Sequence, residues 1–420
     1  MRTIFGAVLL AIVGVFLLAG SASAAGEAVS GKLENRIDGS RTPVAGVEIT
    51  VEGNGVNTTV KSGADGKWTV PLPSEGVYKV TLNVDTLPEG VALTEEGKNV
   101  VEAKVQPPIM NLNVNFPLGV SNSKTESKWQ TAMQLFVEGL RFGLLIALGA
   151  LGLSLIYGTT GLTNFAHGEL ISFGALMTFT FNVILHVPLV IAGLIGVILT
   201  ALFGAAQNGG LWKPLRKRGS GLIAMMIVSI GLAIFLRNVF LYFFGGDKKA
   251  YAEYVGQAGL QLGPVTLTPS DLVTAVIAIV ALGVTVIAIQ KTRLGKATRA
   301  VADNPALASS AGIDVERVIM VVWIVGAALA GLCGVLIAFA QQVSFQMGFQ
   351  LLLLIFAAVT LGGLGTVWGA IVGSLVVGLF LQLSTLFIPP ELKNVGALLV
   401  LIVILLIRPY GLLGRSERVG

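Results

Sequence analysis

The sequence predicts a polytopic α-helical membrane bundle of about nine spans or half-spans, preceded by a small antiparallel β-sandwich domain. Of 420 residues, 54% are hydrophobic and only 12% are charged, about half the charged share of a typical soluble domain. Beyond residue 130 the apolar residues form runs of about twenty residues, the length that crosses a hydrocarbon core. Earlier residues instead form short alternating runs.

Residues 1–24 are predicted to be a signal peptide. Arg2 precedes an apolar stretch from Ile4 to Leu18, and Ala22-Ser23-Ala24 has the small-x-small pattern of a signal-peptidase site. We expect cleavage after Ala24, and an uncleaved anchor helix is the alternative. In both cases the following residues are expected outside the membrane.

Residues 27–118 are predicted to form the extracytoplasmic β-sandwich. The segments 47–51 and 78–84 alternate apolar and polar residues with a period of two. Turn pairs at Asn54-Gly55 and Asp65-Gly66 separate such runs. The linker 119–130, rich in Ser, Asn and Lys, is expected to be solvated.

The order of motifs in this domain resembles the carboxypeptidase-regulatory or transthyretin-like sandwich. The motifs are Pro43-Val44-Ala45-Gly46-Val47, Ala64-Asp65-Gly66-Lys67-Trp68 and Gly76-Val77-Tyr78. The resemblance implies a fold and no catalysis, because such modules are usually accessory.

The transmembrane domain is predicted at 131–410, followed by a cytoplasmic tail at 411–420. Its apolar runs lie at 131–157, 164–185, 187–207, 222–244, 272–289, 318–340, 351–364, 367–387 and 395–407. The run at 351–364 is short, so a full span and a re-entrant half-helix both remain open.

Basic residues predict the orientation of these runs. They cluster in three places: Lys213, Arg216, Lys217 and Arg218; then Lys291, Arg293, Lys296, Arg299 and Arg317; and finally Arg408, Arg415 and Arg418. Crossing the membrane at each run from an outer start places all three clusters in the cytoplasm, as the positive-inside rule requires. Because these residues occupy short loops, the net charge of +5 indicates topology and not a nucleic-acid partner.

Small residues recur every fourth position in two of the later runs. Such stripes let neighbouring helices approach closely, and we expect packing, not chemistry, at Gly326, Ala330, Gly334, Gly365, Gly369 and Gly373.

Polar residues at 164–169 are the candidates for a translocation pathway. A charge inside a membrane costs about 2.5–3.5 kcal/mol on insertion scales, so it tends to face a cavity or a partner. On a regular helix His167 and Glu169 lie on different faces, whereas Asn164 and His167 share one. A helix broken near Gly161 or Gly168 would gather these groups around unwound backbone, as in many solute sites. Interhelical hydrogen bonds that only fix the fold remain the alternative.

The cytoplasmic stretch 293–317 carries the signals of a short helix. Asp303, Asn304 and Pro305 offer a helix start, and Gly312 offers an end. We expect this helix to lie along the inner face, with an ordinary solvated loop as the alternative.

Four segments together resemble the branched-chain amino-acid permeases of ABC importers, a family that includes urea and short-amide permeases. They are YGTTGLTNFAHGE at 157–169, TRLGKATRA at 292–300, LGGLGTVWGA at 361–370 and RPYGLLG at 408–414. The resemblance implies a permease subunit of the inner membrane, not an enzyme, that carries branched-chain amino acids or related small polar solutes. It implies a second permease subunit, two cytoplasmic ATP-binding subunits that dock on the loop at 303–312, and an extracellular solute-binding protein.

The residues alone also bear on energy coupling. No complete nucleotide-binding motif occurs, since the near match at 26–32 is followed by Leu33 where a P-loop has Ser or Thr. ATP-driven transport would therefore need partner chains. The alternative is a stand-alone ion-coupled secondary transporter or channel. Proton-coupled transporters usually need several acidic residues within the membrane, and Glu169 is nearly the only one here, so this alternative has little support. Cys333 is the single cysteine, and no metal or cofactor is predicted.

Overall fold

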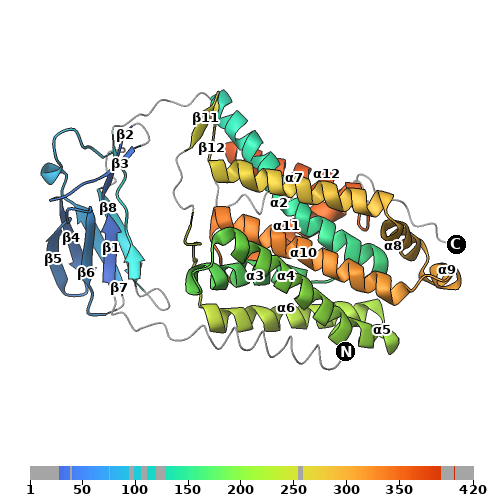
Figure 1. Ribbon diagram of the computed structural model, residues 1–420. Helices are drawn as coiled ribbons and strands as arrows, with labels where there is room; N and C mark the ends of the chain where they lie inside the picture. Colours follow the sequence, from blue (N-terminus) through green and yellow to red (C-terminus); the bar gives the residue numbers. More distant parts are fainter. Residues whose placement is uncertain are drawn as a thin grey trace. The chain divides into compact units, whose positions relative to one another are not determined.

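The computed structural model describes residues 28–37, 40–74, 76–93, 99–105, 111–119, 128–253, 259–388 and 402. The chain divides into a β-rich unit within Ser21–Ser127 and a helical unit that includes Lys128–Gly420 (Figure 1). The predicted signal peptide, most of the linker, the apolar run at 395–407 except residue 402, and the tail lie outside the described residues.

The described residues of the β-rich unit form one four-stranded and two three-stranded sheets. The antiparallel four-stranded sheet has the order β5-β4-β7-β8, with β4 (Glu48–Gly53), β5 (Val56–Lys61), β7 (Gly76–Leu82) and β8 (Val100–Val105). The order β6-β1-β9 joins β1 (Ala28–Lys32), β6 (Lys67–Pro71) and β9 (Asn111–Asn113). The order β10-β2-β3 joins β2 (Glu34–Ile37), β3 (Ser40–Pro43) and β10 (Leu118–Gly119). A 3₁₀ turn, η1 (Val84–Thr86), follows β7.

Two strand pairs depart from the predicted antiparallel arrangement. The pairs β1–β9 and β2–β10 are parallel. Parallel partners need a long crossover, in contrast to the hairpins that join antiparallel neighbours, and β9 and β10 reach β1 and β2 only after the whole four-stranded sheet. Alternation within each strand reveals hairpins but not the direction of such a distant pairing.

One hydrophobic core holds this unit together. In β7 the side chains of Tyr78, Val80 and Leu82 are completely buried, and Val80 lies opposite the buried Val51 of β4. Trp68 of β6 joins the same core. The period-two alternation seen in the sequence is therefore the inward-facing side of each strand.

The helical unit consists of the following elements in order: α2 (Lys128–Thr160), α3 (His167–Phe179), the π-helix η2 (Thr180–Ile184), α4 (Leu189–Gln207), the π-helix η3 (Asn208–Trp212), α5 (Lys213–Lys217), α6 (Leu222–Phe244), the hairpin of β11 (Leu260–Leu262) and β12 (Val265–Leu267), α7 (Pro269–Lys291), α8 (Arg293–Asp303), α9 (Pro305–Ser310), α10 (Val315–Gln341), α11 (Met347–Gly362), α12 (Val367–Leu383) and the 3₁₀ turn η4 (Ser384–Leu386). Figure 1 shows α6 and α7 at opposite edges of this unit.

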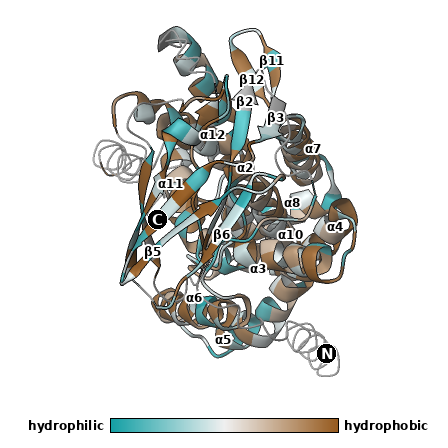
Figure 2. Cartoon of the chain, turned by 90° about the vertical axis from the view of Figure 1, so that its left-hand side faces the viewer, coloured by the Kyte–Doolittle hydropathy of each residue, from teal (hydrophilic) through white to brown (hydrophobic). Residues whose placement is uncertain are grey.

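Six helices among the described residues are long and apolar enough to cross a membrane: Trp129–Thr160, Leu189–Lys217, Leu222–Phe244, Pro269–Lys291, Val315–Gln341 and Val367–Leu386. The predicted count of about nine spans is thus not confirmed. Two predicted runs correspond to short helices, because α3 begins only at His167 and α11 has 16 residues. Side chains such as Leu194, Ile198 and Ile223, each more than half exposed, face outward. Figure 2 shows hydrophobic colour along α4, as expected of a surface in contact with lipid.

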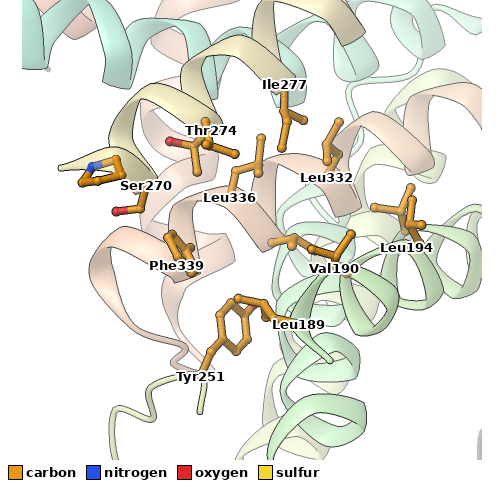
Figure 3. Close-up of a pocket in the computed structure, with 15 residues that line it drawn as sticks. Leu189, Val190, Leu194, Tyr251, Ser270, Thr274, Ile277, Leu332, Leu336 and Phe339 are labelled. Carbon is orange, nitrogen blue, oxygen red and sulfur yellow. The ribbon is translucent and has the colours of Figure 1, made fainter. Parts of the chain in front are cut away.

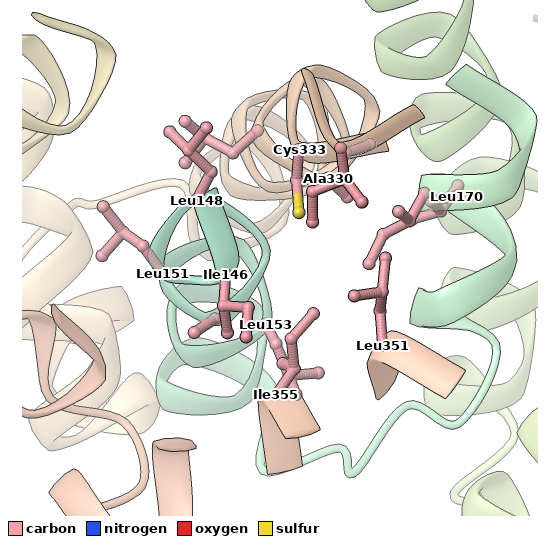
Figure 4. Close-up of a cluster of buried hydrophobic side chains, with 14 of the residues drawn as sticks. Ile146, Leu148, Leu151, Leu153, Leu170, Ala330, Cys333, Leu351 and Ile355 are labelled. Carbon is pink, nitrogen blue, oxygen red and sulfur yellow. The ribbon is translucent and has the colours of Figure 1, made fainter. Parts of the chain in front are cut away.

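Helices α2 and α10 form the centre of the bundle. Helix α10 packs against α2, α3 and α4, and α2 packs against α12. Figure 4 shows side chains from several helices meeting there, including Ile146 of α2, Leu170 of α3, Cys333 of α10 and Ile355 of α11. The core is built mainly from aliphatic residues, with aromatic side chains such as Phe173 and Trp323 among them.

Small residues lie where these helices approach each other most closely. A Cβ added at Gly326 of α10 would stand 2.9 Å from the carbonyl oxygen of Gly152 in α2. Gly334 lies against Ile171 of α3. Ala330, which lies between Gly326 and Gly334 in the sequence, is completely buried.

The second stripe is divided between a turn and a helix. Gly369 packs against Gly362, and Gly373 packs against Ala358 of α11. Gly365 instead precedes α12 with φ +77 and lies beside Gly158 of α2.

Helix packing also uses glycines of α2 outside the two stripes. A Cβ at Gly139 or Gly143 would stand 2.9 Å from the Cα atom of Leu379 or Leu375 in α12. These two glycines are also four residues apart, so α2 and α12 are in close contact over at least one helical turn.

Charged residues from two predicted loops meet at one end of the helical unit. Elements α5, α8 and α9 lie at one end, and the β11–β12 hairpin lies at the other (Figure 1). At the first end, Arg216 and Lys213 lie 3.2 and 3.6 Å from the carboxylate of Glu316. The first two predicted basic loops are therefore neighbours.

Candidate functional site

The chain is broken between α2 and α3. Helix α2 ends at Thr160, and residues 161–166 run as an irregular segment before α3 begins at His167. Gly161 has φ +67, a conformation that glycine adopts at little cost. The amide of Phe165 donates a 3.0 Å hydrogen bond to the hydroxyl of Ser229 on α6. A neighbouring helix thus compensates part of the broken backbone, as a membrane interior requires.

Helix α3 begins deep inside the helical unit. The Nε2 atom of His167 lies 3.0 Å from the carbonyl oxygen of Gly149 in α2. Gly149 is eleven residues before the last residue of α2, a distance of about 16 Å along a helix. The N-cap residue Ala166 supplies no side-chain hydrogen bond to the first turn. The arrangement is a discontinuous helix with an interior N-terminus, a feature of solute sites in transporters.

Three polar side chains around this break are buried and incompletely paired. The exposed fraction is 0% for Asn164 and His167 and 1% for Glu169. The atoms Nδ2 of Asn164, Nδ1 of His167 and Oε2 of Glu169 have no hydrogen-bond partner among the described residues. Leaving a buried polar atom unpaired costs about 1–3 kcal/mol, so each atom has unused capacity for a water molecule or a solute group.

The hydrogen bond of His167 defines what its free nitrogen can do. A carbonyl oxygen only accepts, so Nε2 must carry the proton that is donated to Gly149. In the neutral ring Nδ1 is then an acceptor. Asn164 offers a donor, whereas His167 and Glu169 offer acceptors.

The break does not bring His167 and Glu169 together. Helix α3 is regular from His167 onward, so the two side chains point in different directions, His167 toward α2 and Glu169 toward Arg237 of α6. The Asn164 side chain accepts a 3.0 Å hydrogen bond from the amide of Ala166 and shapes the turn before α3.

The two glycines of this segment have different positions. Gly161 lies at the break, whereas Gly168 is within α3 and packs against Gly348 of α11. The amide of Gly348 donates a 2.9 Å hydrogen bond to the hydroxyl of Ser172. Helices α3 and α11 therefore pack closely at Gly168 and Gly348 and are joined by a hydrogen bond from a backbone amide to a side-chain hydroxyl.

Glu169 is paired with an arginine from another helix. The Nε and Nη2 atoms of Arg237 both lie 3.3 Å from the same Oε1 atom of Glu169. The guanidinium carbon is 4.0 Å from the centroid of the Phe349 ring on α11. A single arginine within an apolar run is the signal in the sequence for this contact. Ser229 and Phe349 carry no such signal.

A separate pocket of about 420 Å³ lies among α4, α7 and α10 (Figure 3). Its lining is mostly apolar and includes Val190, Leu194 and Val273, each more than half exposed. Asn164, His167 and Glu169 do not line it. The pocket therefore faces hydrocarbon and offers little to a polar solute.

The stretch between α7 and α10 contains the predicted short helix. Asp303 ends α8, the Asn304 side chain accepts a 3.0 Å hydrogen bond from the amide of Leu307, and Pro305 begins α9. Gly312 follows with φ +84. Leu307 is 67% exposed, so α9 presents an apolar side chain at the charged end of the bundle.

Within the described ranges, His, Cys, Asp and Glu side chains form no group of three that could hold a metal ion.

Comparison with known proteins identifies the family. The model described as "Branched-chain amino acid transport system / permease component" matches residues 135–405. The chain is 32% identical over 298 residues to the high-affinity branched-chain amino acid transport system permease protein LivH of Salmonella typhimurium, covering 68% of this chain and 96% of LivH. It is 32% identical over 300 residues to BraD of Pseudomonas aeruginosa, with the same coverage. It is 30% identical to a probable LivH of Methanocaldococcus jannaschii, covering 67% of this chain and 92% of that protein.

The matched region begins within α2, so the β-rich unit lies outside it. With six helices among the described residues that are long and apolar enough to cross a membrane, the chain is a multi-pass membrane protein and a transport component, and its relatives are permease proteins, not enzymes. It belongs to the family of branched-chain amino acid transport system permeases.

Proposed function

We propose that this chain is the permease subunit of an ATP-driven importer for branched-chain amino acids or related small polar solutes such as urea and short amides. The family match over residues 135–405 carries this proposal. The relatives LivH and BraD are permease proteins of branched-chain amino acid transport systems. The alternative of a stand-alone ion-coupled transporter has less support, because Glu169 is the single fully buried carboxylate among the described residues.

The permease lies in the lipid bilayer and assembles with a second permease subunit and two cytoplasmic ATP-binding subunits. An extracellular solute-binding protein delivers the solute to it. The loop at 303–312 docks an ATP-binding subunit, which inserts Leu307 of α9 into an apolar groove. Support for this assignment comes from the exposure of Leu307 and from the basic residues at the same end of the bundle.

In the inner membrane, this basic end faces the cytoplasm and the β-domain lies outside. The proximity of Arg216 and Glu316 supports the orientation, since it places two basic loops on one side. Hydrolysis of ATP occurs on the partner chains, consistent with the incomplete P-loop pattern at 26–32.

The segment from Asn164 to Glu169 lines the translocation pathway. Gly161 provides the break, and Gly168 lets α3 approach α11. This assignment is supported by three buried polar atoms without partners at the interior start of a discontinuous helix. Polar groups inside a membrane that face neither a partner nor a cavity are rare, so an opening of the bundle here would expose them to solute.

The test is uptake by purified components in proteoliposomes. The complete transporter with its binding protein should accumulate labelled leucine only when ATP is supplied, and unlabelled valine, urea and acetamide define the solute range by competition. The lone chain should neither hydrolyse ATP nor accumulate leucine. Gradient-driven uptake by the lone chain would contradict the proposal and favour the stand-alone transporter.

A further inference from the structure

We propose that Glu169 and Arg237 recognise the two charged ends of a zwitterionic solute. Arg237 binds the carboxylate of the solute, and Glu169 binds its ammonium group. This inference rests on the proposed function, because it describes how an importer of amino acids would read its solute. It makes Arg237 a specificity-determining residue, which the family match alone does not assign.

The resting contact between the two side chains leaves binding capacity unused. Charge-assisted hydrogen bonds are typically about 2.7–2.9 Å long, and an arginine–carboxylate fork uses both oxygens. Here Nε and Nη2 share the single atom Oε1 at 3.3 Å. The atom Oε2 is buried and has no hydrogen-bond partner among the described residues. An opening of the bundle that admits an ammonium group to Oε2 would therefore not have to break the contact to Arg237 first.

The side chains of Arg237 and Glu169 differ in solvent exposure. The Arg237 side chain is 22% exposed, whereas Glu169 is 1% exposed. Phe349, which lies beneath the guanidinium, is 41% exposed. A solute that approaches along the seam between α6 and α11 thus meets Arg237 first and Glu169 behind it.

Charge balance favours a zwitterion over a singly charged solute. The resting pair has no net charge, and a bound zwitterion adds one charge of each sign opposite its complement. An amine without a carboxylate, or an acid without an amine, would leave one charge unpaired in a medium of low dielectric constant, which is costly. The pair therefore selects for molecules that carry both groups.

The same seam offers apolar surface for the rest of the molecule. Phe356 lies seven residues after Phe349 on α11, so the two share a face of that helix. The Phe356 and Phe165 rings are 5.0 Å apart. Ser229, which holds Phe165, precedes Arg237 by eight residues on α6. The Phe349 ring, 4.0 Å from the guanidinium carbon, is thus the apolar surface nearest the charged pair, and the Phe165–Phe356 rings lie about two helical turns further along the same face.

The first test removes both charges at once. The double variant Glu169→Gln with Arg237→Gln keeps an amide pair and leaves no unpaired charge in the membrane. In the complete transporter with its binding protein, assembly should stay within twofold of wild type, whereas ATP-driven leucine uptake per assembled complex should fall at least tenfold. Uptake within twofold of wild type in the assembled variant would overturn the proposal.

The second test exchanges the charges, with Glu169→Arg and Arg237→Glu together. A merely structural ion pair would be restored by the exchange, and then both assembly and uptake return, which contradicts the proposal. Recognition of the solute requires each charge in its place, so an assembled exchange variant should remain at least tenfold defective. If neither double variant assembles, the pair serves folding and the proposal is wrong.

A matched control uses the ion pair of Arg141 on α2 and Asp271 on α7, whose side chains are 20% and 22% exposed. The double variant Arg141→Gln with Asp271→Asn should leave uptake per assembled complex unchanged. Absence of leucine uptake by the wild-type transporter would refute the proposed function itself, independently of these variants.

Discussion

The hydrogen bond between His167 and Gly149 fastens the start of α3 to the middle of α2, with 3.0 Å between Nε2 and the carbonyl oxygen. It places a helix N-terminus without a side-chain cap in the interior of the bundle. Asn164 and Glu169, the polar residues on either side of this bond, are buried as well.

If this segment lines the pathway, His167→Ala and Glu169→Gln should each reduce leucine uptake at least tenfold and leave assembly with the partner chains nearly unchanged. If the same residues only fix the fold, the variants should instead lower the amount of assembled complex. Removing one member of an interhelical hydrogen bond costs about 1–2 kcal/mol in membranes. Assembly and uptake are measured on the same preparation, and loss of both together contradicts the pathway assignment.

Gly312→Pro should uncouple transport from ATP hydrolysis. Proline holds φ near −65°, whereas Gly312 has φ +84 and its amide donates a 3.0 Å hydrogen bond to Ser309. The change therefore deforms the end of α9, while the bundle outside this loop should stay intact. The measurement is the ratio of leucine uptake to ATP hydrolysis by the complete transporter.

Gly219→Pro is the matched control for this experiment. Gly219 also has positive φ, +70, and lies in the neighbouring loop between α5 and α6. Its variant should keep the wild-type ratio. Normal coupling in Gly312→Pro, or equal uncoupling in both variants, would remove α9 from the mechanism.

Labelling of single introduced cysteines tests the orientation of the chain in the membrane. Ser74 in the β-rich unit is exposed, Ser220 between α5 and α6 is half-buried, and the native Cys333 is buried. In whole cells an impermeant thiol reagent should modify Ser74→Cys and spare Ser220→Cys. The reverse pattern would overturn the proposed orientation, and permeabilised cells, in which both should react, provide the control.

Close packing of α2 and α10 makes Gly326 intolerant of a single added methyl group. Gly326→Ala should lower stability by about 1–3 kcal/mol, because the new Cβ meets the Gly152 carbonyl oxygen at 2.9 Å. Gly283→Ala on α7, where a Cβ meets no atom within 4 Å, should be neutral or slightly stabilising. Thermal unfolding of the two purified variants in one detergent gives the comparison, and equal stability would contradict the packing.

The sequence predicts the two-part organisation because each part has a strong periodic signal. Alternation in 78–84 identified β7, and runs of apolar residues identified the six long helices. The start of α9 was also readable, because an Asn-Pro pair caps a helix by local chemistry. These features depend on neighbours in the sequence.

The features that the sequence does not predict depend on distant partners. The glycine at 161 and the polar residues after it indicate a break in the helix. The contact of His167 with Gly149, at the start of α3, joins residues that are far apart in the sequence. Arg237 is conspicuous by its charge, yet only the fold brings it to Glu169 and Phe349. The parallel pairing of β1 with β9 likewise joins strands from opposite ends of the domain.

Protection of position 164 by solute is the most direct test that the broken segment forms the pathway. Asn164→Cys in the complete transporter should react with a small, membrane-impermeant thiol reagent during ATP turnover, and saturating leucine should slow the reaction at least fivefold. In the resting complex the site should be unreactive, because position 164 is completely buried. A position 164 that stays unreactive during turnover, or that reacts equally fast with and without leucine, would contradict the assignment.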